Sequence, residues 1–381
     1  MNISFKESHP KNFKVGRISA IEFIVLHYTA NDGDTAKNNA DYFARESAGA
    51  SAHYFVDESS TIWQSVKDED TAWHCGTTGP YKHPVCRNDN SLGIEMCSRK
   101  DSNSIFYVKQ NTADNASDLT KMLMDKYNIP IENILRHYDV TSKQCPEPFV
   151  RITELWSAFK SRLVPDKRPK ILIDPGHGGS DHGASGYMLL FENANYTFKQ
   201  FYEKELTLKI ASKLKKQFEI QLEEVAAFLS REDDINLSDQ DRIRLADAYD
   251  VDAIISLHFA SYPPNSGYGG WGVETFYAKS SQRDRNFAQS LHNSLTTNFT
   301  CKNRGVKNST QSQNDALDIL TIGTGDYLRS VISLDFPDSP KSFNINDSDS
   351  LQYVFGYNWD KQVIDFSYAT ISGCGIPIER M

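Results

Sequence analysis

The sequence predicts an α/β protein built from two domains, each with a central mixed or mostly parallel sheet flanked by helices. Its 381 residues exceed one ordinary domain and suit two. The chain has almost continuous apolar runs at Ile21–Leu26, Ile171–Asp174 and Val251–Phe259. Such runs are typical of strands buried on both faces, as in parallel sheets. Amphipathic segments with helical spacing lie between them, which favours strands that alternate with helices.

Composition and charge exclude several classes of partner. The 39% hydrophobic and 12% aromatic content is typical of a packed globular protein. The net charge of -9 argues against nucleic acid as a partner, because counterion release needs a basic face. No apolar run is long enough to span a membrane, so we expect no membrane insertion. The opening, MNISFKESHPKNFKVGR, has no apolar core, which predicts a chain made in the cytoplasm without a signal peptide.

A charged segment with two prolines, SRLVPDKRPK at residues 161–170, predicts a domain edge. We therefore expect one domain at residues 1–164 and a second at residues 165–381. The sequence does not determine the oligomeric state or how the two domains are oriented.

The first domain is predicted to open with the buried strand Ile21–Leu26, which places His27 at its carboxyl end. Open α/β sheets bind their ligands at this end. A helix at Lys37–Arg45 and a hairpin of Ser51–Asp57 with Ile62–Val66 are expected next. A lone histidine at a strand end is more often a satisfied core residue, and the His27 interpretation therefore depends on a partner loop.

That partner loop is RHYDVTSKQCPEP, residues 136–148, in which His137 and Cys145 lie eight positions apart. The residues between them favour turns over helix. An imidazole and a thiolate suit a borderline-soft cation such as Zn²⁺, and His27 is the best candidate for the third ligand. Lys143 would place an ammonium group beside the same metal.

A further strand, Leu92–Cys97, carries Glu95. A carboxylate in an apolar strand is costly unless it is paired, protonated or near a metal. We interpret Glu95 as a general base or acid near the zinc; the alternative is a solvated residue on an edge strand. Helices at Ala116–Tyr127 and Arg151–Leu163 are predicted to complete the domain.

Six cysteines are present, and metal binding by Cys145 would leave an odd number. We expect mostly reduced, buried thiols. Spacing alone leaves open the disulfide status of three of them: Cys75, Cys86 and Cys97. The segment with His74, Cys75, His83 and Cys86 fits no ordinary zinc spacing, and we interpret these residues as groove-lining loop residues.

Five motifs occur in the order HYTA, SAHYFVD, AWHCG, NSLGIEM and RHYDVTSKQCP. Together they resemble the type 2 N-acetylmuramoyl-L-alanine amidases, the family of phage lysozyme-amidases and peptidoglycan recognition proteins, over residues 15–163. The resemblance implies zinc held by three residues, with Glu95 and Lys143 assisting; the three are His27, His137 and Cys145. His53 stands where some relatives carry a catalytic tyrosine. The implied reaction is hydrolysis of the amide between muramic acid and L-alanine of the stem peptide.

The second domain begins with the strand Ile171–Asp174 and a Pro-Gly turn that presents His177. The glycine-rich stretch after it lacks the phosphate-loop and dinucleotide spacings. On the amphipathic helix Glu203–Phe218, Glu203 lies on the apolar stripe, although a solvated N-terminal charge is the alternative. His258 ends a buried strand. Two histidines and a glutamate with an open position predict a second hydrolytic zinc site.

This half contains IDPGHGGSDHGASG, EKELTLKIASKL, ISLHFAS and NRGVK. It resembles the type 3 N-acetylmuramoyl-L-alanine amidases over residues 170–336, which implies zinc at the same three residues and cleavage of the same bond. The family carries a catalytic glutamate in a late strand, where this sequence has VISLDFPDS. Ser333 occupies that place, and Asp335 lies two residues on. Three alternatives stay open: Asp335 substitutes as the catalytic residue, the domain is weakened, or the domain only binds wall material.

The sequence therefore leaves three hypotheses for the function of this protein. The first is an endolysin-like, bacteriolytic amidase that degrades peptidoglycan in the cell wall after holin-type release or another non-classical export. The second is a cytoplasmic enzyme that recycles soluble muropeptides. The third is a wall-binding module in which neither site turns over, and Glu95 with Lys143 beside a full ligand set argues against it for the first domain.

Overall fold

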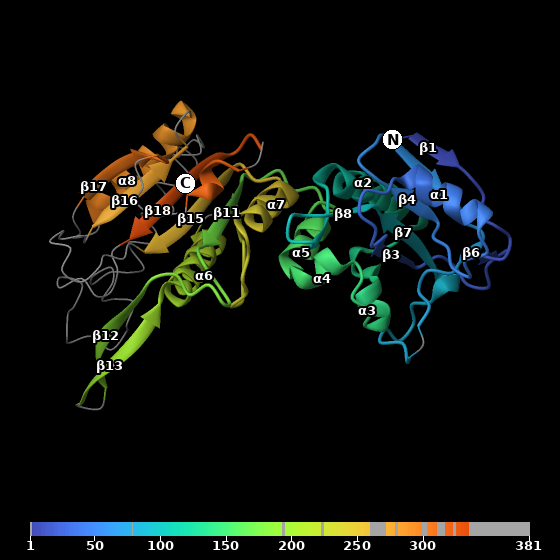
Figure 1. Ribbon diagram of the computed structural model, residues 1–381, viewed down its shortest axis with the longest axis horizontal. Helices are drawn as coiled ribbons and strands as arrows, with labels where there is room; N and C mark the ends of the chain where they lie inside the picture. Colours follow the sequence, from blue (N-terminus) through green and yellow to red (C-terminus); the bar gives the residue numbers. More distant parts are fainter. Residues whose placement is uncertain are drawn as a thin grey trace. The chain divides into compact units, whose positions relative to one another are not determined.

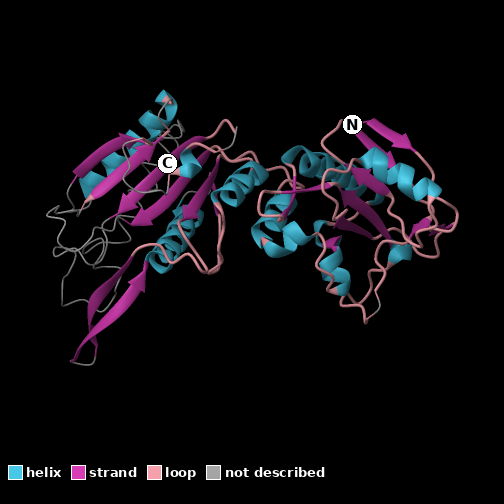
Figure 2. Cartoon of the chain, in the orientation of Figure 1, coloured by secondary structure: helices cyan, strands magenta, loops and turns pink. Residues whose placement is uncertain are grey.

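The computed structural model describes residues 2–77, 79–192, 195–221, 225–259, 272–278, 281–298, 303–310, 317–322 and 325–334. The chain divides into two compact units, Met1–Asp166 and Lys167–Met381. Each unit contains a mostly parallel sheet with helices packed against it, which confirms the predicted α/β class (Figures 1 and 2). None of the helices in the described part of the chain combines the length and the apolarity that a bilayer crossing requires.

The first unit is built on a six-stranded sheet. Its strands, in pairing order, are β1 (Asn2–Phe5), β5 (Thr61–Gln64), β4 (Tyr54–Val56), β7 (Ser91–Met96), β3 (Phe23–Tyr28) and β10 (Ile134–Arg136). The predicted hairpin is confirmed, since β4 and β5 pair antiparallel, and the other neighbours run parallel. The middle strands are almost completely buried, in keeping with their apolar sequences. Smaller pairs are β2 (Phe13–Lys14) with β6 (Thr71–Ala72), and β8 (Ser98–Lys100) with β9 (Phe106–Val108).

Helices lie between and after these strands along the chain. They are α1 (Ala36–Arg45), α2 (Gln110–Tyr127), α3 (His137–Thr141), α4 (Glu147–Arg151) and α5 (Thr153–Ser161), with short 3-10 turns at Asn88–Asn90 and Ile131–Asn133. The hydroxyl of Thr35 accepts from the Asn38 N–H at the start of α1, so this helix is capped by its own sequence. The second helix begins six residues before the predicted Ala116 because its polar first turns carry no apolar signal.

Two expectations about the ligand loop and the last helix are wrong. The residues after His137 form the short helix α3 rather than a turn, because the Asp139 carboxylate accepts from the Arg136 N–H at 2.9 Å and caps the helix. The helix ends where Ser142 adopts a left-handed conformation, with φ 67°. The single helix predicted at Arg151–Leu163 is divided, since extended Ile152 separates α4 from α5.

The second unit also has a six-stranded sheet. Its strands, in pairing order, are β14 (Ala226–Leu229), β11 (Lys170–Pro175), β15 (Ala253–Phe259), β18 (Leu328–Leu334), β16 (Val273–Tyr277) and β17 (Asn303–Asn308). The first four run parallel to one another, and β16 is antiparallel to β18. A separate hairpin joins β12 (Ser185–Glu192) to β13 (Asn195–Tyr202).

Three helices and a short 3-10 turn complete the described part of this unit: α6 (Glu203–Gln221), α7 (Asp239–Tyr249), α8 (Gln282–Asn298) and Asp318–Leu320. A single apolar cluster joins α6 and α8 to alternate residues of the strands, including Ile173 and Ile255. Helix α7 packs against β11. The parallel strands have their carboxyl ends at one edge of the sheet, and α6 begins near this edge, where the Glu203 carboxylate accepts from the Phe259 N–H.

Candidate metal centres

The first unit brings His27, His137 and Cys145 together. His27 lies near the end of β3, and His137 follows β10, which pairs parallel to β3. Both histidines therefore reach the carboxyl edge of the sheet, and Cys145 approaches from the loop after α3. One ligand atom from each residue lies within 4.8 Å of the others, and all three side chains are buried. The Sγ of Cys145 is 3.8 Å from Nδ1 of His27.

This group fits a soft divalent cation. Neither ring nitrogen of buried His137 has a hydrogen-bond partner of acceptable geometry in the described chain. Burial and the charge of Lys143 lower the pKa of His137 to about 4, so its imidazole is neutral and offers a lone pair. Burial likewise holds the pKa of His27 well below its usual value and raises that of Cys145 to about 12. Two neutral imidazoles and a thiol that needs a cation to ionise match the donor set of zinc.

Glu95 lies directly beside the group. Strand β7 pairs with β3 so that Glu95 is opposite His27, and partners in register share a face of the sheet. Its Oε2 is buried without a hydrogen-bond partner. Burial raises the pKa of Glu95 to about 8, with Asp34 acting in the same direction and Lys143 against it. A carboxyl group with a pKa near neutrality is suited to proton transfer.

Lys143 lies between α3 and Cys145, and its side chain is exposed. Its charge lowers the pKa values of His27, His137 and Glu95, which places the ammonium group within electrostatic reach of all three. It is therefore an exposed cation at the solvent side of these buried groups.

His53 does not belong to the metal group. Its Nδ1 accepts from the Gly93 N–H at 3.0 Å, and its Nε2 lies 3.3 Å from the carbonyl oxygen of Asp70. The Arg17 guanidinium also contacts this ring, at 2.6 Å. These contacts join the start of β4 to β7, so the position where some type 2 amidases carry tyrosine serves here to hold the sheet together.

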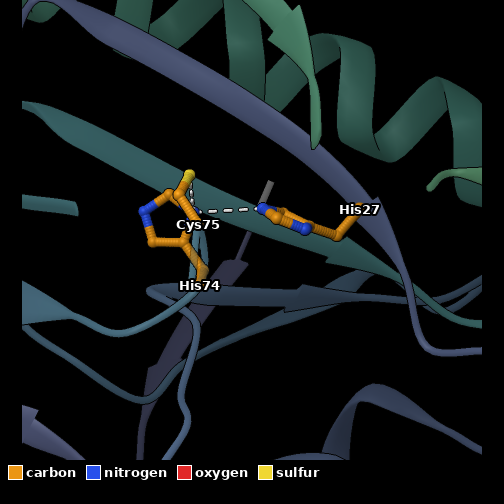
Figure 3. A group of neighbouring side chains, drawn as sticks. All are labelled: His27, His74 and Cys75. Carbon is orange, nitrogen blue, oxygen red and sulfur yellow. Dashed lines mark hydrogen bonds between the residues drawn. The ribbon is translucent and has the colours of Figure 1, made fainter. Parts of the chain in front are cut away.

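The interpretation of four residues as groove-lining loop residues is wrong for three of them; the four are His74, Cys75, His83 and Cys86. His74, Cys75 and Cys86 are buried, whereas His83 accepts the backbone N–H of Cys86 at 2.9 Å. His74 and Cys75 form a second candidate group with His27, in which the ligand atoms again lie within 4.8 Å of one another (Figure 3). The cysteines of this unit are all free thiols, so the structure contains no disulfide among them.

The second unit brings His177, Glu203 and His258 within the same 4.8 Å limit. His177 follows β11, Glu203 is the first residue of α6, and His258 lies near the end of β15. Oε1 of Glu203 is 3.1 Å from Nε2 of His177 and 3.1 Å from Nδ1 of His258. Asp181 Oδ2 lies 2.9 Å from Nδ1 of His177, a carboxylate partner of the kind that orients metal-binding histidines.

Electrostatics differ between the two groups. Burial alone would raise the pKa of Glu203, but hydrogen bonds from His177 and His258 hold it well below its usual value. Burial opposes protonation of His177, yet Glu203 and Asp181 raise its pKa. These ligands therefore satisfy one another through hydrogen bonds, whereas the ring nitrogens of His137 in the first unit have no such side-chain partner in the described chain. Two imidazoles and a carboxylate nevertheless form a donor set that suits zinc.

Two buried arginines fix the turn that presents His177. Arg231 donates to the carbonyl oxygens of Pro175 and Gly176 at 3.1 and 3.0 Å. Arg242 donates to the carbonyl oxygen of His177 at 2.9 Å and pairs with the carboxylate of Asp174. These bonds hold His177 at φ 62°, a conformation that side chains rarely adopt.

The catalytic candidate of the second unit, Asp335, lies outside the described residues. Ser333 does lie inside them, opposite His258 on β15 and opposite Glu274 on β16. These three residues form a row on one face of the sheet. The carboxylate of Glu274, which the sequence did not single out, is bound by Lys307 at 2.7 Å and by Arg304, both from NRGVK.

Comparisons with known proteins match both halves of the chain. Residues 17–148 match the Amidase_2 family and residues 171–328 match the Amidase_3 family, both described as N-acetylmuramoyl-L-alanine amidase. A probable N-acetylmuramoyl-L-alanine amidase of Bacillus licheniformis is 35% identical over 155 residues, covering 39% of this chain and 42% of that protein. The N-acetylmuramoyl-L-alanine amidase BlyA of Bacillus subtilis is 33% identical over 159 residues, with the same coverage of 39% and 42%. The chain thus spans less than half the length of these relatives.

Among solved structures, the catalytic domain of the amidase CwlV from Bacillus (Paenibacillus) polymyxa is 17% identical, with a TM-score of 0.40, covering 55% of this chain and 99% of that chain. The catalytic domain of XlyA is 26% identical, with a TM-score of 0.36, covering 43% of this chain and 100% of that chain. The family matches confirm both resemblances and their order. The chain therefore contains a region that matches Amidase_2, followed by a region that matches Amidase_3, and both families are described as N-acetylmuramoyl-L-alanine amidases.

Proposed function

We propose that this protein hydrolyses the amide between N-acetylmuramic acid and L-alanine of the peptidoglycan stem, and that its first domain carries this activity. One observation supports the proposal above the others. A buried set of two neutral histidines and a cysteine, with unpartnered nitrogens on His137, lies beside the unpartnered carboxyl group of Glu95. A folded protein rarely leaves such groups unsatisfied unless a ligand completes them.

In this proposal His27, His137 and Cys145 hold zinc. When bound, zinc supplies Lewis acidity that brings the pKa of water to about 7. Glu95 accepts a proton from the attacking water and passes it to the departing amine, which requires its carboxylate to be ionised at the start. Lys143 reaches in from solvent and stabilises negative charge that develops on the carbonyl oxygen.

A second zinc is proposed at His177, Glu203 and His258. Burial and the arginine-held turn keep these ligands together, and Asp181 orients His177. The position opposite His258 carries Ser333, whose hydroxyl is a poor general base. Hydrolysis by this domain would therefore need another carboxylate, for which Asp335 is our candidate; without one, the domain would bind wall material at its metal.

The proposed setting is the bacterial wall, which the protein would reach by holin-type release or another non-classical export and lyse as an endolysin does. Comparison of intact sacculi with small soluble muropeptides as substrates tests this setting. Faster release of L-alanine amino termini from sacculi would support wall lysis, whereas activity confined to soluble fragments would favour muropeptide recycling.

The activity itself is tested with Cys145→Ala and His177→Ala, assayed for bound zinc and for new L-alanine amino termini from peptidoglycan. Cys97→Ala and His182→Ala are matched controls, since Cys97 is a buried free thiol outside the metal groups and His182 is exposed. We expect each test variant to lose one zinc and Cys145→Ala to lose most activity. Full activity in folded, zinc-depleted Cys145→Ala would refute the assignment to the first domain.

A further inference from the structure

His27 presents its two ring nitrogens to different surroundings. Nδ1 faces the metal group, where it is 3.8 Å from Sγ of Cys145. Nε2 faces the interior, 3.0 Å from Nδ1 of His74 (Figure 3). Only a nitrogen without a proton can bind a metal, so the tautomer of His27 decides whether Nδ1 is a ligand.

A chain of hydrogen bonds continues from His74 into the protein. The Nε2 of His74 lies 3.2 Å from the hydroxyl of Ser91, and this hydroxyl donates to the carbonyl oxygen of Arg87 at 2.5 Å. His27, His74 and Ser91 are all buried. Water therefore does not compete for these bonds, and each group must find its partner within the chain.

The carbonyl end of this chain sets its direction. A backbone carbonyl can only accept, so the Ser91 proton points to Arg87 and the Ser91 lone pairs accept from Nε2–H of His74. Nδ1 of His74 then has no proton and accepts from Nε2–H of His27. The remaining nitrogen of His27, Nδ1, is left with a free lone pair toward the metal group.

Two neighbours of His74 fit this arrangement. The thiol of Cys75 lies 3.1 Å from Nδ1 of His74, where its S–H can donate to the same unprotonated nitrogen. Gly93 on β7 provides the space, since a Cβ at this position would lie 2.5 Å from Cγ of His74. A side chain at position 93 would therefore push the imidazole from its place.

We propose that His74, held by Ser91 and the Arg87 carbonyl, is a positioning residue that fixes the metal-binding tautomer of His27. This inference rests on the proposed role of His27 as a ligand. The competing interpretation of Figure 3, a second metal bound by His27, His74 and Cys75, requires Nδ1 of His74 to bind metal and therefore gives a different stoichiometry.

The test measures zinc affinity by competition with a chromophoric chelator, on the full chain carrying His177→Ala so that the first site is observed alone. His74→Phe keeps a ring but removes both nitrogens, and we expect its zinc dissociation constant to rise about 10–100-fold. His74→Asn can offer an oxygen near the position of Nδ1 and should recover part of this loss. His9→Phe is the matched control, because the Nδ1 of His9 contacts only the Lys11 backbone.

Ser91→Ala provides a second route that leaves the imidazole in place. Without the hydroxyl, His74 loses the acceptor that holds its proton on Nε2, and we expect zinc affinity to fall about 10-fold or less. Cobalt titration followed by visible absorption reports whether the thiolate of Cys145 still binds at saturation. Retained thiolate absorption with weaker affinity is the expected result.

The outcomes separate this inference from the proposed function. If the parent protein binds no zinc at the first site, the function proposal fails first. If the parent binds tightly and folded His74→Phe and Ser91→Ala bind equally tightly, His74 does not position His27. Loss of a whole zinc equivalent in His74→Phe, from a parent that holds two in the first unit, would show instead that His74 is a ligand.

Discussion

The surroundings of Glu95 set the protonation of its carboxyl group. It lies in a buried strand opposite His27, and its Oε2 has no hydrogen-bond partner in the described chain. Burial raises its pKa to about 8, whereas Lys143 acts in the opposite direction. The same carboxyl group on an exposed strand would be an ordinary solvated charge.

We predict that Glu95→Gln lowers turnover by about 10²–10⁴-fold while zinc content stays near that of the parent. The amide has almost the same shape, so it removes proton transfer without opening a cavity. Turnover is measured as L-alanine amino termini released per bound zinc. A change of less than tenfold would show that Glu95 is not the base.

We predict that Lys143→Ala lowers turnover by about 10²–10³-fold and leaves zinc content nearly unchanged. Its side chain is exposed and contributes no ligand, so the loss should come from charge stabilisation in the transition state. Lys143→Arg is the control that keeps the charge. Loss of metal from Lys143→Ala would mean that the residue supports the ligand loop instead.

At the scale of elements, the turn after β11 depends on helix α7. Arg242 on this helix pairs with Asp174, which also accepts from Ser230 and Ser256 at 2.5 Å each. Asp174 is only 1% exposed, so its charge cannot be solvated by water. The ion pair and the carbonyl contacts of Arg242 thus link the strand, the turn and the position of His177.

We predict that Arg242→Met destabilises the second unit by about 3–5 kcal/mol, because it leaves the Asp174 carboxylate buried and unpaired. Urea unfolding of His177→Ala proteins with and without this change measures the loss apart from metal binding. Arg283→Met is the surface control, since Arg283 pairs with a highly exposed Asp326. Adding Asp174→Asn to Arg242→Met should restore part of the stability.

At the scale of the whole molecule, each unit encloses its own cluster of titratable residues. The first unit buries four histidines at or near the metal group: His27, His53, His74 and His137. The pKa of each is lowered chiefly by burial, to about 3 for His53 and about 4 for His137. Without metal, this unit therefore folds around neutral imidazoles.

We predict that the metal-free first unit loses stability as pH falls. The unfolded chain takes up protons below the ordinary histidine pKa of 6.5, whereas folded His53 stays neutral down to about pH 3. The folded state therefore binds fewer protons in this window, and its stability is present above pH 6.5 and lost below it. For His53 alone, the loss between pH 7 and pH 5 is about 2 kcal/mol.

Urea unfolding of chelator-treated protein at pH 7 and pH 5 measures this loss. His53→Asn keeps an acceptor for the Gly93 N–H and removes one titrating group, so its free energy of unfolding should fall less between the two pH values. An equal fall in both proteins would mean that His53 is protonated in the folded state.

Much of this architecture follows from local sequence. The apolar runs predicted β3, β11 and β15, because a strand with consecutive apolar residues must be covered on both faces of its sheet. The ends of these runs placed His27 and His258 at the ends of strands. Glu203 was placed on the apolar stripe of α6 by helical spacing, and it is buried while Glu205 is exposed. Turn preference failed at α3, where the Asp139 cap outweighed it.

Contacts between distant segments could not be predicted in the same way. The bond between His27 and His74 spans 47 positions, and it depends on the register of β3 with β7 and on the space left by Gly93. The buried arginines of the second unit gave no periodic signal, because an arginine in a polar segment such as LSREDD is ordinarily solvated. Glu274 was overlooked because its cationic partner Lys307 lies on another strand, β17, and such a pairing leaves no local pattern in the sequence.

The sequence by itself therefore determined the fold class, the two amidase domains and the residue types able to bind metal, because apolar periodicity and motif order are local properties of a chain. Only the tertiary structure decided which histidine nitrogens of the first unit lie close to Cys145 and which are held by hydrogen bonds inside the protein. Strand register and packing set the position of each ring nitrogen and its hydrogen-bond partners. Those partners determine which nitrogen has a free lone pair for a cation, and the presence of a histidine in the sequence does not.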